Sequence, residues 1–279
     1  MQENADQQEL LHPFLVDSHA HLELEPLINV AEAVVQRALA ARIAYIITVG
    51  IDLDDAKLAL ALADRFEMVF ACVGFHPHNA KEVDAEAFLK MEALAHHPKV
   101  MGYGEIGLDF FRDHSPRDSQ IEVFAYQLSL AKKLEKPVVI HLRNAYTQGL
   151  GMLEQAAPFP AGGIIHCFSG TEVDCGRALD LGFHVSIPGT VTYKKNEALR
   201  SVVASIPAER LLLETDCPFL TPEPLRGKDN EPAYIEHTAR RVAEVRQTSF
   251  EEICRTTTEN ALRVFRLPSI TTDNKRQLC

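Results

Sequence analysis

Short apolar runs rich in β-branched residues alternate along the chain with longer amphipathic segments. The runs are nearly continuous in apolar character, which is typical of parallel strands buried on both faces. Eight of them are predicted strands, beginning at Phe14, Ala44, Met68, Val100, Pro137, Gly162, Phe183 and Arg210. Each is followed by a segment long enough to form a helical crossover.

The segments between the runs carry apolar residues at the 3.6-residue period of an amphipathic helix. Examples begin at Leu27, Asp54, Arg117, Glu172, Asn196 and Ala233. Strands that alternate with helical crossovers form a parallel sheet covered by helices. Eight such units predict the α/β class and a single (β/α)₈ TIM barrel. The stretch 249–265 predicts an additional C-terminal helix.

One domain is enough to account for the chain. Its 279 residues exceed by a small margin the roughly 250 that such a barrel needs. We predict a barrel over 14–267, with an N-terminal tail at 1–13 and a C-terminal tail at 268–279. No apolar run approaches the roughly 20 residues that span a bilayer, and the acidic, amide-rich start has no signal-peptide pattern. We therefore expect a cytoplasmic protein without membrane contact and without an obligate protein partner.

Composition and charge narrow the functional classes. The chain is 46% apolar and carries a net charge of −11, which argues against a protein that holds duplex nucleic acid mainly through phosphate contacts. An anionic substrate stays possible, because bound cations dominate the field at a site. The six cysteines contain no C-x-x-C pair, so zinc-finger spacing is absent and we expect reduced thiols.

Metal-capable side chains fall where the predicted strands end, which is where TIM barrels carry their catalytic groups. In the stretch "VDSHAH", His19 and His21 are two positions apart, so the strand pleat points both to one face. A lone histidine at such a place is more often a hydrogen-bonded core residue than a ligand. Further candidates end the fourth, fifth, sixth and eighth strands: Glu105, His141, His166 and Asp216.

Together these six residues predict a metal site, because buried unpaired carboxylates are costly and a cation removes that cost. Four imidazoles and two carboxylates exceed one tetrahedral ion; they suit two divalent ions about 3.5–4 Å apart that share a carboxylate. Strand 8 lies beside strand 1 in a closed barrel, and this neighbourhood determines which ligands share an ion. We assign the first ion to His19, His21 and Asp216, the second to His141 and His166, and the bridge to Glu105.

At these motifs the chain resembles the TatD-type metal-dependent hydrolases, a branch of the amidohydrolase-like TIM barrels. The matching stretches are "DSHAHL", "GFHPHNA", "GEIGLDF", "HLR", "HCFSG", "LLLETDCPFLTP" and "TTENALRVF". They cover nearly the whole chain, and no ligand position departs from the family pattern. The resemblance implies a divalent-metal-dependent nuclease, generally a deoxyribonuclease; some members remove D-amino acids from mischarged tRNA. It also implies Mg or Mn for activity, whereas Zn or Ni could occupy the purified protein.

Four further residues are candidates for substrate contacts. His76 could hydrogen-bond a phosphate, or be a loop histidine held by Pro77. Arg143 shares the parity of His141 and could clamp a phosphate oxygen, or form a surface salt bridge. Asp109 could meet the substrate or support a ligand from behind. Ser169 opens a turn into a helix, where backbone N–H groups can receive an anion.

We expect a hydrolase that cleaves phosphodiester bonds in DNA, with single-stranded 3′ ends favoured because a barrel mouth admits a strand terminus more easily than an intact duplex. The expected catalytic residues are Asp216, as general base toward a water activated by the ions, and Glu105. The alternatives are a D-aminoacyl-tRNA deacylase, or a small ester or amide hydrolase, at the same two metals. A non-catalytic metal-binding scaffold is a third interpretation, disfavoured by the complete ligand set.

Overall fold

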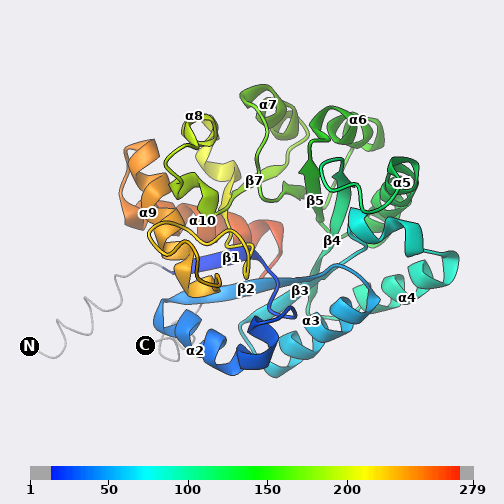
Figure 1. The fold of residues 1–279 in the computed structure, drawn as a ribbon, viewed down its shortest axis with the longest axis horizontal. Helices are drawn as coiled ribbons and strands as arrows, with labels where there is room; N and C mark the ends of the chain where they lie inside the picture. Colours follow the sequence, from blue (N-terminus) through cyan, green and yellow to red (C-terminus); the bar gives the residue numbers. More distant parts are fainter. Residues whose placement is uncertain (1–13, 271–279) are drawn as a thin grey trace, which may run out of the picture.

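The computed structural model describes residues 14–270, and its centre is one sheet of eight parallel strands (Figure 1). The strands neighbour one another in chain order, and helices cover the outside. They are β1 (Leu15–Ala20), β2 (Ile43–Gly50), β3 (Val69–Val73), β4 (Val100–Asp109), β5 (Val138–Arg143), β6 (Gly163–Ile165), β7 (His184–Ile187) and β8 (Leu211–Leu213). The predicted TIM barrel and all eight predicted strands are confirmed. The predicted N-terminal tail lies outside the described residues.

Helices follow the strands as the periodicity indicates. Side-chain caps mark several starts: Asp52 accepts from the backbone N–H groups of Asp54 and Asp55, and Thr171 forms a capping box with Asp174. The helices are α2 (Ala31–Ala40), α3 (Leu53–Arg65), α4 (Ala85–Ala95), α5 (Arg117–Lys133), α6 (Tyr146–Ala156), α7 (Glu172–Asp180), α8 (Glu197–Ser205), α9 (Ile235–Arg246) and α10 (Phe250–Val264). Short 3₁₀ helices are η1 (Leu27–Val30), η2 (Pro77–Glu82), η3 (Gly189–Thr192), η4 (Ala208–Arg210) and η5 (Pro232–Tyr234). None of the described helices combines the length and apolar character needed to cross a membrane.

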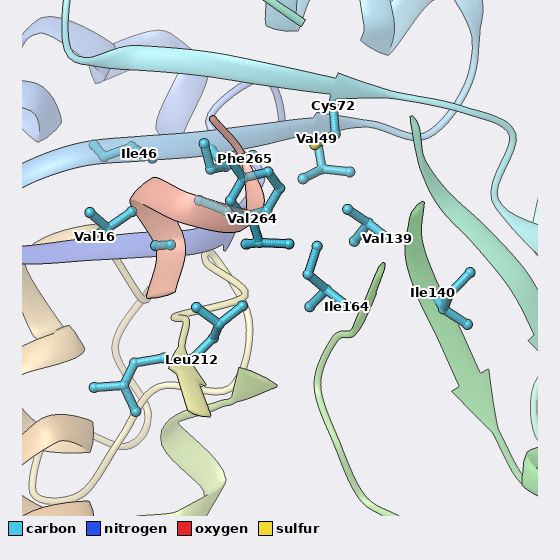
Figure 2. Packing of buried hydrophobic residues seen from close by; sticks show 14 of the residues in the cluster. Val16, Ile46, Val49, Cys72, Val139, Ile140, Ile164, Leu212, Val264 and Phe265 are labelled. Carbon is cyan, nitrogen blue, oxygen red and sulfur yellow. The ribbon is translucent and has the colours of Figure 1, made fainter. Parts of the chain in front are cut away.

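The additional C-terminal helix α10 seals the end of the barrel at which the strands begin. Thr258 donates a hydrogen bond to the carbonyl of Phe14, and Asn260 donates to those of Ala208 and Leu211. Figure 2 shows Val264 and Phe265 among apolar side chains that come from several strands. Those labelled there include Val16, Ile46, Val49, Cys72, Val139 and Ile164, all buried. The opposite end of the barrel is therefore the one available for a site.

The barrel closes between β8 and β1 through individual hydrogen bonds. The N–H of Asp216 donates to the carbonyl of His19 (2.9 Å), and that of His21 donates to Cys217 (2.8 Å). The buried carboxylate of Asp17 accepts from both the N–H (2.9 Å) and the hydroxyl (2.6 Å) of Thr215. This seam places the polar residues that follow β8 against those of β1.

Candidate metal centre

His19 and His21 point into the mouth of the barrel from β1, with their Nε2 atoms 3.3 Å apart. The Nδ1 of His21 lies 2.9 Å from the carbonyl of Val49 and 3.0 Å from Oε1 of the buried Glu23. Nδ1 is therefore the protonated nitrogen, since both of its partners only accept. This leaves the lone pair of Nε2 facing the cluster, as a metal ligand requires.

Glu105 lies inside β4, whereas the sequence placed it at the strand end. Between the pairs Tyr103–Val138 and Ile106–Ile140, β4 has one residue more than β5, which is a bulge. The bulge turns the Glu105 carboxylate into the barrel, and β4 continues to Asp109. No hydrophobic pattern marks a bulge, so the strand end was misplaced.

The two oxygens of Glu105 face two different pairs of histidines. Oε1 lies 2.5 Å from Nδ1 of His141 and 2.7 Å from Nε2 of His166. Oε2 lies 3.3 Å from Nε2 of His19 and 3.8 Å from Nε2 of His21. A carboxylate placed in this way has the geometry of a bridge between two sites.

His141 and His166 form the second pair, with His141 Nδ1 and His166 Nε2 3.2 Å apart. His141 lies within β5 rather than at its end, and His166 follows β6 directly. The Nε2 of His141 is directed toward the Asp109 carboxylate at 3.4 Å. The ring of His166 stacks on that of His19 with centroids 3.9 Å apart, which joins the two pairs.

Asp216 completes the group from the far side of the seam. It lies three residues after β8, in a left-handed backbone conformation (φ 54°). Its Oδ1 is 3.5 Å from Nε2 of His21 and 3.9 Å from Nε2 of His19. The Asp216 side chain is 14% exposed while that of Glu105 is 3% exposed, so Asp216 is the carboxylate that solvent and substrate reach.

The donor set fits divalent cations. Burial favours the neutral acid of Glu105, but the imidazoles of His166, His76 and His141 outweigh it and hold its pKa well below the usual range. For Asp216 burial is likewise outweighed, first by the hydrogen bond to His21, and its pKa is lowered. Ionised carboxylates among close imidazole nitrogens are a ligand set for Zn, Ni, Mn or Mg.

The possible ligand groups agree with the expected set in part. The ligand atoms of His19, His21 and Asp216 lie within 4.8 Å of one another, which is the grouping expected for the first ion. The second group is formed by His76, Glu105 and His141, and a third by His19, His166 and Glu214. His76 and Glu214 were absent from the expected ligand set.

Two buried carboxylates behind the histidines were missed in the sequence. Glu23 contacts His21, as described above. Glu214 accepts a hydrogen bond from the N–H of Cys167 (2.7 Å), and its Oε1 lies 3.6 Å from Nδ1 of His166. Each lies two positions from an expected ligand, so the parity that paired His19 with His21 could have found both.

Two of the expected substrate contacts, His76 and Asp109, are buried beside the candidate ligands. His76 is the N-cap of η2, three residues after β3, and its Nε2 lies 3.4 Å from Oε1 of Glu105. Asp109 is fully buried, contacts His78 (2.9 Å), and accepts from the N–H groups of Phe111 and Arg112. Although burial opposes ionisation, these bonds and that to His141 lower the pKa of Asp109. The Asp109 carboxylate thus contacts the His141 ring, and its expected contact with substrate stays a prediction.

The other two, Arg143 and Ser169, are exposed at the mouth. The Arg143 guanidinium lies over the Phe111 ring, 4.3 Å from its centroid. The N–H of Ser169 donates to the hydroxyl of Tyr146 (2.9 Å). This N–H is therefore already occupied and is not free to bind an anion, contrary to the expectation. Arg143 keeps a position from which it can reach a substrate.

Known proteins with similar sequences and folds include metal-dependent hydrolases. The family model described as TatD related DNase matches residues 16–266. A metal-dependent hydrolase from Bacillus subtilis, YabD, is 40% identical over 91% of this chain and 99% of its own length. A protein from Citrobacter koseri named 3′-5′ ssDNA/RNA exonuclease TatD is 34% identical over 90% of this chain and 98% of its own length. The crystal structure of the TatD homologue YJJV from Escherichia coli superposes with a TM-score of 0.87 at 29% identity, covering 91% of this chain and 98% of that one.

Proposed function

The chain belongs to the TatD related DNase family and is a metal-dependent hydrolase acting on ester bonds, and on that premise we propose that it cleaves phosphodiester bonds in single-stranded DNA with two divalent ions. The observation that carries the proposal is the Glu105 carboxylate, whose two oxygens face separate histidine pairs. A centre with one ion needs no such arrangement.

We assign the ions to the residues expected from the sequence. His19, His21 and Asp216 would hold one, and His141 and His166 the other, with Glu105 between them. When bound, such ions lower the pKa of a water molecule and neutralise charge on phosphoryl oxygens. Mg or Mn is the proposed activating metal, and Zn or Ni would bind the same imidazoles tightly.

Side chains of the centre transfer the protons of the reaction and orient the metal ligands. Asp216 is held by its own N–H on the His19 carbonyl and is the accessible carboxylate of the centre. We assign to it the removal of a proton from the attacking water and the return of a proton to the leaving oxygen. Glu23 and Asp109 hold the rings of His21 and His141 in orientation.

The preference for single strands rests on the shape of the site and on a relative. The candidate centre lies at the mouth of a barrel that is sealed at its other end, and the Citrobacter koseri relative is named for a 3′-5′ exonuclease activity on single-stranded DNA and RNA. A free 3′ end in DNA is accordingly the proposed substrate. The cytoplasmic location expected from the sequence stays a prediction.

The test compares substrates and one variant at matched metal content. Protein loaded with Mg or Mn is incubated with labelled single-stranded DNA, duplex DNA and D-aminoacyl-tRNA. We expect shortening of the single strand from its 3′ end. Cleavage confined to the aminoacyl ester would contradict the proposal and favour the deacylase.

Asp216→Asn should lower kcat on the single strand about 100-fold or more, while calorimetry still detects bound metal. Asp229→Asn is the matched control, since this carboxylate is exposed in the loop after β8 and has no assigned role. A near-normal rate for Asp216→Asn at equal metal content would remove Asp216 from catalysis.

A further inference from the structure

Two phenylalanines are exposed at the mouth of the barrel, although burial of a side chain of this size is strongly favourable. Phe111 is 55% exposed and Phe219 is 52% exposed. Both are held by hydrogen bonds to residues at the candidate centre: the N–H of Phe111 donates to the Asp109 carboxylate (2.9 Å) and that of Phe219 to the Asp216 carbonyl (2.9 Å). The ring of Phe219 lies 6.3 Å from that of His21, centroid to centroid.

The two rings lie on opposite sides of the metal centre. Phe111 follows β4 and Phe219 follows β8, and these strands are four places apart in an eight-stranded barrel. The histidines and Glu105 lie between them. A linear polymer that crosses the mouth with its reacting group at Glu105 therefore meets one phenylalanine ring on each side of that group.

Two positively charged guanidinium groups also lie close to the Phe111 ring. The guanidinium of Arg143 lies 4.3 Å from its centroid and that of Arg112 lies 5.7 Å from it. Within residues 14–270 no carboxylate lies at ion-pair distance from either guanidinium, whereas the nearby Arg117 is paired with Asp113. Arginines left without a carboxylate in a chain of net charge −11 are available to an anionic ligand.

The remaining loops at the mouth differ in charge. Lys194 and Lys195 after β7 and Lys228 after β8 are exposed. The loops after β1 and β2 carry the acidic residues Glu25 and Asp52. The loop after β8 also carries the acidic residues Glu223 and Asp229. The arginines beside Phe111 therefore form the clearest positive region of the mouth, and an anionic chain is attracted to that side.

We propose that Phe111 and Phe219 are stacking platforms for the bases on either side of the cleaved phosphodiester, with Arg143 and Arg112 contacting the adjoining phosphates. This inference rests on the proposed function and specifies how its substrate is held. Aromatic rings and positive charge in alternation bind single-stranded nucleic acid independently of its sequence. Paired bases of a duplex have their faces covered, so the same platforms select unpaired strands.

The test separates base stacking from phosphate binding. Binding is measured by fluorescence anisotropy in the metal-loaded Asp216→Asn background, where cleavage is expected to be about 100-fold slower or more. The probes are a labelled single-stranded oligodeoxynucleotide and an abasic strand of equal length and charge. We expect tighter binding of the strand that carries bases, and Phe111→Leu and Phe219→Leu should each reduce this preference about tenfold.

Two further variants make the result interpretable. Phe111→Trp keeps a stacking surface and should retain the preference. Tyr126→Leu is the matched control, because Tyr126 is a half-exposed aromatic residue on α5 that packs against Phe88, outside the mouth. An unchanged preference in both leucine variants, or no binding of either strand, would overturn the inference. If the parent protein cleaves single-stranded DNA but the leucine variants keep the preference for bases, the proposed function is retained and the stacking inference is rejected.

Discussion

At the scale of single residues, the candidate centre depends on side chains that contact no substrate. His21 presents Nε2 to the cluster only because Glu23 and the Val49 carbonyl occupy Nδ1. Glu23 is itself held by the hydroxyl of Thr48. A hydrogen-bond partner behind a ligand histidine fixes its tautomer and raises its basicity.

Replacement of Glu23 should therefore weaken metal binding. We expect Glu23→Gln to reduce the affinity for the first ion about tenfold or more, because the amide can turn its NH₂ group toward the ring. Calorimetric titration of the metal-free protein with Mn or Zn measures this. Glu25→Gln, two residues away and exposed, should behave like the parent; equal affinities in both variants would contradict the assignment.

At the scale of the elements, strands β4 and β5 approach closely beside the centre, and glycine permits the contact. Gly107 has φ 147°, and a Cβ built there would lie 2.0 Å from the carbonyl oxygen of His141. The backbone of β4 can therefore follow β5 past His141 only without a side chain at this position.

Gly107→Ala should lower the free energy of unfolding by about 3 kcal/mol, since it combines an unfavourable φ with a backbone clash. Gly151→Ala is the control in helix α6, where a Cβ meets nothing within 4 Å. That variant should gain about 0.5–1 kcal/mol from helix propensity. Urea unfolding of the three proteins measures both values, and a Gly107→Ala protein as stable as the parent would contradict this account of the strand contact.

A structural feature can be predicted from the sequence when it produces a periodic pattern of apolar and polar residues. The eight strands and the (β/α)₈ barrel follow from apolar runs, and the six expected ligands from polar residues that interrupt those runs. The bulge at Glu105 and the contact between Arg143 and Phe111 leave no trace in the hydrophobic period. The first is a local irregularity, and the second joins the end of β5 to the loop after β4. The sequence left two roles open for Asp109, because a strand-end carboxylate looks the same whether it faces outward or supports a histidine.

At the scale of the whole molecule, the stability of the barrel depends on pH through a histidine that lies outside the candidate centre. His184 begins β7 and is 5% exposed. Burial, with help from the charges of Arg210 and Arg263, lowers its pKa from 6.5 to about 4. The unfolded chain therefore binds a proton at pH values where the folded protein does not.

The sign follows from this difference. Above pH 6.5 His184 is neutral in both states and has no effect, and stability is lost as the pH falls from 6.5 toward 4. Between pH 8 and pH 5 the loss is about 2 kcal/mol. His184→Gln should remove that part of the pH dependence in urea unfolding, whereas His96→Gln, at an exposed position, should retain it. Parallel curves for His184→Gln and the parent would contradict the prediction.

The seam between β8 and β1 also links the candidate centre to protein synthesis. Its proposed ligands come from both the first strand and the segment after the last, since His19 and His21 face Asp216 across the join. A nascent polypeptide that has not yet reached residue 216 lacks the accessible carboxylate and the partner that closes the barrel. We therefore expect hydrolytic competence to arise only once the segment after the final strand has been translated.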